Sequence, residues 1–523
     1  MLDDARMFLR FAGGLHRFLS TPLSWDDCRR MLEELKRERD RTFLLVMERA
    51  VYTRPESPYR KLLAWAGVEL GDLRTMVAQE GVEGTLRKLL EAGVYLHFEE
   101  FKGKRPIQRP GLEIEVSAED FDNPLLAREF ELATGGSGGK RRRLNIDFDQ
   151  IKIDAVGQHA MTVAHDVADY PEVLWRPVPP GGSGIRNALM RSKMGGPVDF
   201  WFTPNSPAWG AEPWKSVVFQ KYAVAASRLT GYPLQAPVHV PVSEPAPVVR
   251  ELARFVQAGT PGRLDAPVSS CLRAATFAMD HGLDLSGSWF RMGGEPLTAA
   301  KAEIFARAGV RTCVGWTLSE CGRIGFGCAR PEVPDEVHLW DGKMAVLPRN
   351  LDLGLETVQA LHLTTLSLAA PKLMLNLESG DYGTFTDRRC GCLLEELGMA
   401  RHIHTIRSYE KLTAGGMQFL GSDLLALIDE ALPARFGGGP TDYQFIEEES
   451  EGRTVVRLLI HPDRGLVDER AAVELALASL GGGSRGQSMM AEHWRSGEML
   501  SVARAVPETN NAGKTPPLIV RKK

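Results

Sequence analysis

Thr134-Gly135-Gly136-Ser137-Gly138-Gly139-Lys140, followed at once by Arg141-Arg142-Arg143, is the stretch of this 523-residue chain from which its fold is best inferred. Four glycines, two hydroxyl residues and a lysine predict a loop whose backbone N–H groups approach phosphate oxygens, while Lys140 adds a positive charge. A solvated surface turn with a run of charges explains the same residues. Partners elsewhere in the chain must decide between the two interpretations.

Two other kinds of phosphate loop do not match this stretch. The G-x-x-x-x-G-K-[ST] loop needs glycine at position 134 and a hydroxyl residue at position 141, where the chain has Thr134 and Arg141. A dinucleotide-binding loop is followed by a helix, whereas the alternation from Leu144 to Ile153 predicts a strand.

The composition is that of a globular protein. With 43% hydrophobic and 25% charged residues, the chain is long enough for a large core and roughly two to four domains. A net charge of -4 and a pI near 6.4 argue against nucleic acid or an anionic membrane as a partner. The absence of a secretory leader and of any apolar run of about 18 residues leads us to expect a cytoplasmic protein without membrane contact. Seven cysteines in so long a chain argue against a disulfide framework.

The order of helix and strand patterns predicts an α/β protein of two parts. Helical periodicity dominates residues 1–100, and helices alternate with short apolar strands from about 155 to 310. After Ile406 the pattern changes to short strands, helices and glycine-rich breaks. The sequence therefore predicts a large, multi-layer α/β domain over 1–406 and a small, mobile α+β domain over 407–523.

Two segments at predicted strand ends are candidates for a ligand site. Gly293-Gly294-Glu295-Pro296 follows one apolar strand, and a second strand from Val314 ends in Leu318-Ser319-Glu320. Ligands of α/β sheets bind at the carboxyl ends of strands. A carboxylate such as Glu320 there suits a Mg2+ ion that bridges phosphates, although an ordinary strand terminus at the surface explains it equally well.

Two later segments add to this set. Leu373 to Leu377 is a predicted strand that leads into a turn with Asp381, which either binds sugar hydroxyls or is a plain turn aspartate. The tail carries Asn-Ala-Gly-Lys, which ends at Lys514.

The fixed order of these segments resembles the adenylate-forming enzymes, specifically the branch that is similar to phenylacetate-CoA ligase. The resemblance covers about residues 59 to 523. It implies that Thr134 to Lys140 binds ATP phosphates, that Glu320 is associated with Mg2+, and that Lys514 and Lys140 are catalytic cations. The rest of the implied ATP and AMP site comprises Gly293, Gly294, Glu295 and Pro296 at the adenine, Asp381 at the ribose, and Trp316, Thr317, Ser319 and Arg407.

The chain departs from the family's pattern at three places. Its phosphate loop has fewer hydroxyl residues, and Trp316 and Thr317 replace the usual tyrosine and small residue. Tyr409-Glu410 stands where the family usually has two aspartates, which alters the expected hinge for domain rotation.

Cys328, His338 and the pair Cys390 and Cys392 form a loosely spaced set of thiols and an imidazole. From spacing alone, four unlinked reduced residues explain it better than a metal site. The resemblance implies a structural zinc ion, because members of the branch carry similarly placed ligands, and three thiolates with one imidazole make a closed tetrahedral site. Cys321 is expected to be a packed thiol.

The resemblance implies an ATP-dependent ligase that forms an acyl-adenylate from a small carboxylic acid, releases pyrophosphate and transfers the acyl group to CoA. The alternatives are transfer to a thiol of a carrier or partner protein, and a scaffold that binds nucleotide without catalysis. The acyl pocket is expected between about residues 155 and 295, where aromatic residues indicate an apolar site or simply fill the core. The resemblance implies that a homodimer is possible, because dimers are common in the family, but the sequence does not determine the oligomeric state.

Overall fold

A computed structural model of the chain describes residues 2–127, 129–133, 143–178, 182–205, 213–230, 233–352, 357–408, 413–414, 417–418, 421–450, 453–482, 485–496 and 499–521. The loop from Thr134 to Lys140, and Tyr409 and Glu410 at the predicted hinge, lie outside these residues.

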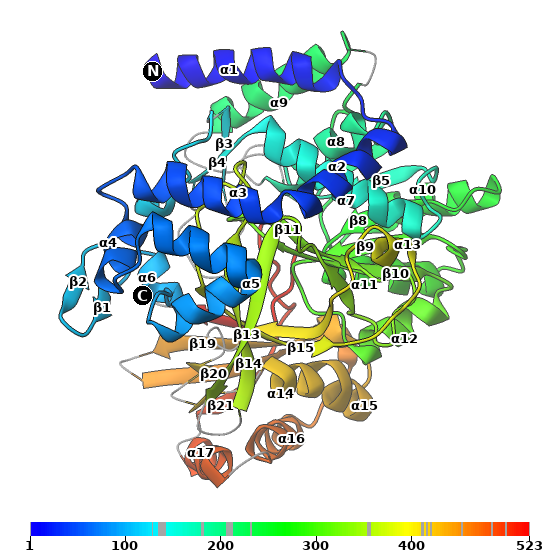
Figure 1. Cartoon of the computed structure of the whole chain (residues 1–523). Coiled ribbons are helices and arrows are strands. Elements are labelled where there is room, and N and C mark those ends of the chain that lie inside the picture. The colour runs from blue at the N-terminus through cyan, green and yellow to red at the C-terminus, as the bar shows by residue number, and fades with distance from the viewer. Residues whose placement is uncertain are drawn as a thin grey trace.

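The described residues form helices and strands that alternate through most of the chain (Figure 1). The helices include α1 (Leu2–Leu19), α2 (Trp25–Arg37), α3 (Arg39–Val46), α4 (Pro58–Trp65), α5 (Leu70–Glu91), α6 (Phe98–Phe101), α7 (Phe148–Ala164), α8 (Ser183–Lys193), α9 (Pro213–Ser227), α10 (Ala246–Gln257), α11 (Val268–Asp280), α12 (Ala299–Arg307), α13 (Leu393–Glu396), α14 (Gly421–Ala426), the π-helical turn η3 (Leu427–Ala431), α15 (Leu432–Phe436), α16 (Glu469–Gly481) and α17 (Arg485–Ser496). The strands include β1 (Ile107–Arg109), β2 (Leu112–Ile114), β3 (Phe130–Ala133), β4 (Arg143–Ile146), β5 (Glu172–Trp175), β6 (Phe200–Thr203), β7 (Val238–His239), β8 (Arg263–Ala266), β9 (Trp289–Gly293), β10 (Arg311–Leu318), β11 (Gly322–Gly327), β12 (Val337–Leu339), β13 (Met344–Asp352), β14 (Thr357–Thr365), β15 (Leu377–Thr386), β16 (His402–Ser408), β17 (Thr413–Ala414), β18 (Met417–Gln418), β19 (Tyr443–Ser450), β20 (Arg453–Ile460), β21 (Leu500–Arg504) and β22 (Leu518–Arg521).

A twelve-stranded sheet organises the large part of the molecule. Its strand order is β13-β14-β15-β16-β12-β11-β10-β9-β8-β5-β6-β7. Neighbours from β7 to β10 pair in parallel, and those from β10 to β13 pair antiparallel. The parallel half follows from the helices between its strands, since a parallel connection needs a crossover. This mixed α/β sheet, together with a smaller C-terminal sheet, confirms the predicted fold class.

The two faces of the parallel half are packed differently. Leu264, Ala266, Phe290 and Met292 belong to one apolar core with residues of α10, α11 and α12. Because side chains alternate along a strand, Arg263, Asp265 and Arg291 point to the opposite face, which α7 and α8 cover. Buried charges on central parallel strands are unusual, since such strands are normally apolar throughout.

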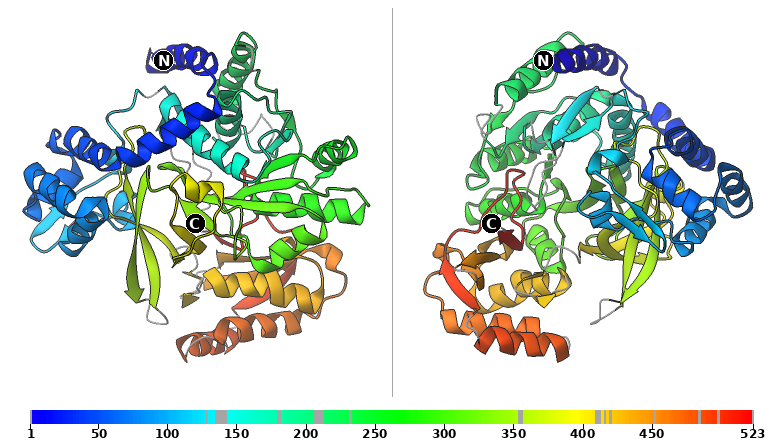
Figure 2. Two further views of the ribbon diagram at one scale, coloured as in Figure 1. Left: turned by 45° about the vertical axis from the view of Figure 1, so that its right-hand side comes forward. Right: turned by 90° about the vertical axis from the view of Figure 1, so that its left-hand side faces the viewer.

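The C-terminal residues form a second, smaller sheet of order β21-β20-β19-β22. Helices α14 and α16 contribute to its apolar core, which includes Leu424, Leu458, Leu477 and Trp494. After β21 the chain leaves this sheet, reaches the large domain and returns as β22, which pairs with β19. Figure 2 shows the small domain, in orange and red, below the large one.

Three local predictions from the sequence are wrong. The predicted strand from Leu144 to Ile153 is short, because β4 ends at Ile146 and helix α7 starts at Phe148 after the N-cap Asp147. The predicted strand over Leu373 to Leu377 is a loop up to Asn376, whose φ of 48° is incompatible with a strand. Asp381 lies within β15 rather than in a turn.

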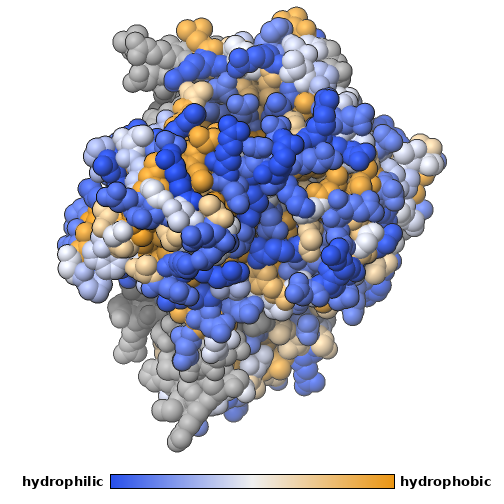
Figure 3. Space-filling model, viewed as in Figure 1, coloured by the Kyte–Doolittle hydropathy of each residue, from blue (hydrophilic) through white to orange (hydrophobic). Residues whose placement is uncertain are grey.

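No helix among the described residues is long and apolar enough to cross a bilayer. On the face of the molecule drawn in Figure 3, hydrophilic residues predominate and apolar ones are scattered among them.

We predict that Asn376→Ala destabilises the large domain by about 2 to 4 kcal/mol. The Asn376 amide donates to the carbonyl oxygens of Leu86 (2.8 Å) and Val94 (3.1 Å), and so joins the N-terminal helices to the sheet. Alanine would remove both bonds and strain the left-handed backbone. Urea unfolding measures the change. Asn350→Ala, at an exposed position of β13, is the matched control and should change stability by less than about 0.5 kcal/mol; equal effects would contradict the proposed tie.

Candidate active site and metal cluster

Two of the predicted motifs leave the sheet side by side. Strands β9 and β10 are parallel, and Gly293 lies opposite Gly315 in their register. The segment from Gly293 to Pro296 and the segment from Trp316 to Glu320 therefore start at the same carboxyl edge, where α/β sheets place ligands. A bulge between Trp316 and Thr317 bends the second segment where it leaves the strand.

Lys514 of the small domain reaches this edge. Gly294 has φ +80°, and a Cβ atom there would lie 2.7 Å from Cε of Lys514. The lysine therefore packs against backbone that only glycine leaves bare. The structure thus brings together two motifs that are about 220 residues apart in the sequence.

Hydrogen bonds hold the loop that carries Lys514. The carboxylate of Glu295 accepts from the backbone N–H of Ser269 (3.0 Å) and from that of Thr515 (3.0 Å). The hydroxyl of Ser270 donates to the carbonyl oxygen of Gly513 (2.8 Å). Glu295, which the resemblance places at the adenine, thus joins the start of α11 to the residue after Lys514.

A buried contact beside this loop also joins the two domains. Asp429, on η3 of the small domain, accepts from the Thr298 hydroxyl (2.7 Å) and pairs with the Lys301 ammonium (2.9 Å). Because the Asp429 side chain is only 1% exposed, breaking this pair would leave a buried charge, which is costly.

Glu320 has a cationic partner that the sequence did not reveal. Its carboxylate forms an ion pair with Lys102, which follows α6 and also lies 4.8 Å from the centre of the Phe98 ring. Burial alone would raise the pKa of Glu320, but the Lys102 ammonium outweighs it and lowers that pKa. Glu320 is therefore held as a carboxylate, the ligand type that Mg2+ prefers. No sequence motif marks Lys102.

Asp381 and Arg407 form a second group. They lie on neighbouring strands, where Asp381 is opposite Ser408, and the Arg407 guanidinium donates to Asp335 (2.7 Å). In the sheet order, β16, β12 and β11 separate β15 from β10.

The remaining predicted residues occupy less specific positions. Trp316 is 9% exposed and packs in the large core, whereas Thr317 is exposed and Ser319 is half-buried. Trp175 and Trp201, from the expected aromatic pocket, are fully buried core residues.

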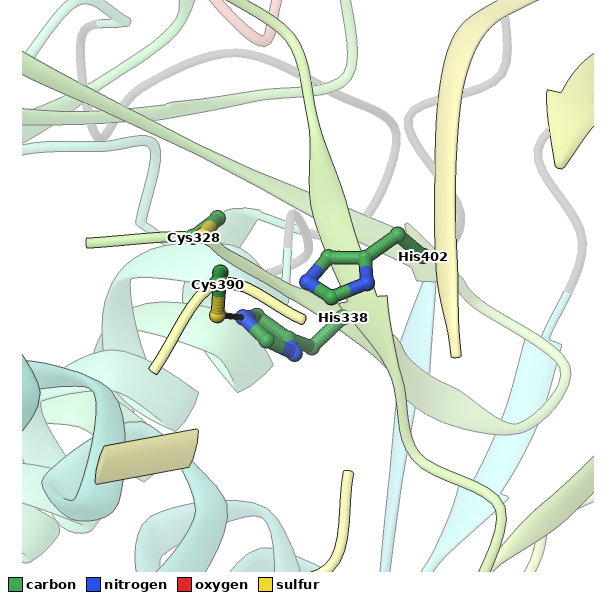
Figure 4. Close-up of side chains that lie close together, drawn as sticks. All are labelled: Cys328, His338, Cys390 and His402. Carbon is green, nitrogen blue, oxygen red and sulfur yellow. Dashed lines mark hydrogen bonds between the residues drawn. The ribbon is translucent and has the colours of Figure 1, made fainter. Parts of the chain in front are cut away.

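The predicted metal ligands come together at the far end of β11 (Figure 4). Cys328 follows β11, His338 lies on β12, and Cys390 and Cys392 precede α13. The Nε2 atom of His338 is 3.2 Å from the sulfur of Cys392 and 3.6 Å from that of Cys390. A fifth candidate ligand, His402 of β16, lies beside them: ligand atoms of Cys328, His338, Cys390 and His402 lie within 4.8 Å of one another. We call these four side chains, together with that of Cys392, the metal cluster.

The chemistry of these donors fits zinc. His338 Nδ1 lies 2.6 Å from the carbonyl oxygen of Met399, so Nδ1 carries the proton and Nε2 presents its lone pair to the sulfurs, as in zinc-bound histidines. A hydrogen bond from Cys328 and the nearby His338 lower the pKa of Cys392, which favours the thiolate that a metal requires. Both ring nitrogens of His402 are buried without a hydrogen-bond partner among the described residues.

We predict about one zinc ion per chain, held by Cys328, His338, Cys390 and Cys392, because three thiolates and an imidazole fill a tetrahedral site. Elemental analysis of purified protein measures it. Cys392→Ser should lose the metal and lower the melting temperature, whereas Cys321→Ser, at a buried thiol outside the cluster, should keep it. His402→Ala tests the fifth candidate: zinc should be retained, and its loss would put His402 in place of one cysteine.

We also predict a pH-dependent effect of Lys102→Met. The folded-state pKa of Glu320 is below its ordinary value of 4.5, so the pair stabilises the fold above that pH and its contribution disappears as pH falls. Without Lys102, burial raises the pKa of Glu320 instead. The loss of unfolding free energy should be largest near pH 7 and shrink below about pH 4. Lys104→Met, at an exposed pair with Glu99, is the control; a loss independent of pH would contradict the assignment.

Solved structures are similar to this chain over nearly its whole length. No family model and no curated protein matches the sequence. A crystal structure of 2-hydroxyisobutyryl-CoA ligase in the postadenylation state with R3-HIB-AMP is 13% identical, with 93% of this chain and 90% of that chain covered and a TM-score of 0.56. A second one, with 2-HIB-AMP, is 14% identical, with coverages of 93% and 90% and a TM-score of 0.53. The chain therefore has the fold of the adenylate-forming enzymes, which the order of its motifs predicts.

Proposed function

We propose that this protein activates a carboxylic acid with ATP, releases pyrophosphate and transfers the acyl group to a thiol, that of CoA. The observation that carries the proposal is the position of Lys514. A lysine from the small domain is fixed by hydrogen bonds against Gly294, at the same sheet edge as Glu320.

In the first reaction, a carboxylate oxygen of the substrate attacks the α-phosphorus of ATP, and the bond to pyrophosphate breaks. Two anions must approach each other, so the site has to supply positive charge and orientation rather than a nucleophile. Lys514 supplies one charge. Mg2+ bound by Glu320 would supply another, and in its absence Lys102 neutralises that carboxylate.

The remaining residues have roles in holding the nucleotide. We assign the adenine to the segment from Gly293 to Pro296 and the ribose to Asp381 with Arg407, on the strength of the resemblance. We assign the phosphates to the loop from Thr134 to Lys140, with Lys140 as a further cation, on the strength of its sequence.

The second reaction is attack of a thiolate on the acyl-adenylate with loss of AMP. Small-domain rotation would break the bonds of Glu295 to Thr515 and of Ser270 to Gly513, so these contacts belong to the adenylation step. The Cys and His cluster supports the phenylacetate-CoA ligase-like branch. Formation of a CoA thioester without any added protein distinguishes CoA from a carrier-protein thiol as acceptor.

We predict that purified protein releases pyrophosphate from ATP and Mg2+ with at least one class of aryl, fatty, amino or hydroxy acid, and that Lys514→Ala lowers the rate by about 100- to 1,000-fold. A coupled pyrophosphate assay measures both. Lys104→Ala removes an exposed lysine elsewhere and should leave the rate unchanged. An unchanged rate in Lys514→Ala would refute the role of Lys514. ATP binding without pyrophosphate release on any acid would favour the non-catalytic scaffold.

A further inference from the structure

A layer of buried charges lies between the sheet and helices α7 and α8, next to the candidate active site. Its seven charged side chains are at most 13% exposed. They are the cations Arg176, Arg186, Arg291, Arg323 and Lys343 and the carboxylates Asp154 and Asp265. Within this group five positive charges share two negative ones, and we call it the cationic layer. Arg263, on the same face, pairs with Glu172 (2.8 Å) and is not counted in it.

The two carboxylates are shared among four of the cations. Asp265 accepts from Arg176 Nε (2.8 Å) and pairs with Arg291. Asp154 pairs with Arg186 (2.7 Å) and Lys343.

The fifth cation, Arg323, donates its guanidinium hydrogens to neutral amides. The Nη2 atom bonds to Oε1 of Gln158 and to Oδ1 of Asn187 (3.0 Å). The same Asn187 oxygen accepts from Arg291 (2.9 Å). Asn187 therefore bridges two guanidinium groups with an uncharged oxygen, where a carboxylate would be the natural partner.

Unused polar atoms mark the side of the layer nearest the candidate active site. Arg323 Nε is buried without a hydrogen-bond partner among the described residues, and so are both amide atoms of Gln150, which is 1% exposed. Gln150 lies against Gly322, where a Cβ atom would be 2.7 Å from Gln150 Nε2. Gly322 is two residues after Glu320. Buried polar groups are nearly always satisfied, so these atoms indicate a missing polar ligand.

Repulsion within the layer points to the sign of that ligand. Burial and the neighbouring Arg323 and Arg176 lower the pKa of Arg291 well below its ordinary value. Cations buried without counter-charges are strongly disfavoured. A bound anion would remove the imbalance.

We propose that the cationic layer is the inner end of the acyl pocket and binds a second carboxylate of the substrate, which is therefore a short-chain dicarboxylic acid. This inference rests on the proposed function and names its substrate class. Arg291 lies two residues before Gly293 on β9, so the layer is roughly 6.6 Å below the edge where adenylation takes place. That depth suits one carboxylate at the edge and one at the layer, joined by a few methylene groups. In this proposal the inner end of the acyl pocket is charged, whereas one interpretation of the sequence was an apolar pocket lined by aromatic residues.

The test compares diacids with monoacids of equal chain length, by isothermal titration calorimetry and thermal melting of the intact protein without ATP. Succinate, glutarate and adipate are paired with butyrate, valerate and hexanoate. We expect at least one diacid to bind at least tenfold more tightly than its partner and to raise the melting temperature. Equal binding of a monoacid would mean that the layer holds the reacting carboxylate. No binding of any diacid, or an equal response to ATP alone, would also overturn the proposal.

Pyrophosphate release separates this inference from the proposed function. A tenfold or larger preference in kcat/KM for the diacid supports both. Release with monoacids and no diacid preference refutes the dicarboxylate pocket and leaves adenylation intact. Diacid binding without pyrophosphate release refutes the adenylation chemistry and leaves the anion pocket intact.

A pair of buried asparagines supplies the matched variants. Asn187→Asp places a carboxylate between Arg291 and Arg323 but loses the bond from the Asn187 amide to the carbonyl oxygen of Ser183 (2.8 Å), so its melting temperature should fall less than that of Asn123→Asp while diacid binding weakens at least tenfold. Asn123→Asp is the control: the Asn123 amide donates to the carbonyl oxygens of Leu368 (2.8 Å) and Ala370 (2.9 Å), so the variant should melt lower and keep diacid binding. If folded Asn187→Asp binds the diacid as tightly as the unaltered protein, the cationic layer is not the site.

Discussion

The bonds of the Glu295 carboxylate determine how the two domains meet at the candidate site. One oxygen accepts from the start of α11 and the other from Thr515, beside Lys514. Hydrogen bonds to a charged group contribute about 1.5 to 3 kcal/mol each. With the pair of Asp429 and Lys301, they favour this arrangement of the two domains. The position of Lys514 is a consequence of these contacts.

The central sheet keeps two kinds of interior apart. The face under α10, α11 and α12 is apolar and supplies the stability of the large domain. The opposite face carries Arg263, Asp265 and Arg291 beneath α7 and α8. Burying charges there costs stability, since the desolvation of an ion pair can exceed its Coulombic gain. Such a cost is typical of functional sites, where local rules are broken for a purpose.

The metal cluster lies at the other end of the antiparallel half. Strand β11 begins next to Glu320 and ends at Cys328, so the cluster is separated from the candidate active site by the length of a strand. Its predicted ligands come from the residue after β11, from β12 and from the turn before α13, and a metal there would join these three segments. This position favours a structural role over a catalytic one.

The sequence alone determined the mixed α/β fold, the smaller second sheet and the order of the motifs, because periodicity and turn residues are local properties of the chain. It also singled out Gly294, Glu320, Lys514 and the Cys and His cluster as candidates, through short motifs and through the resemblance that their order carries. It misassigned residues 147–153, where the N-cap Asp147 starts a helix, and residues 373–376, where Asn376 has a left-handed backbone. In both segments the strand pattern rested on only a few residues. Only the tertiary structure placed Lys102 on Glu320, brought His402 to the cysteines and gathered the cationic layer. These groups are far apart in the sequence and are brought together by the order of the strands and the packing of the helices. No local sequence pattern indicates which distant charged residues are buried together.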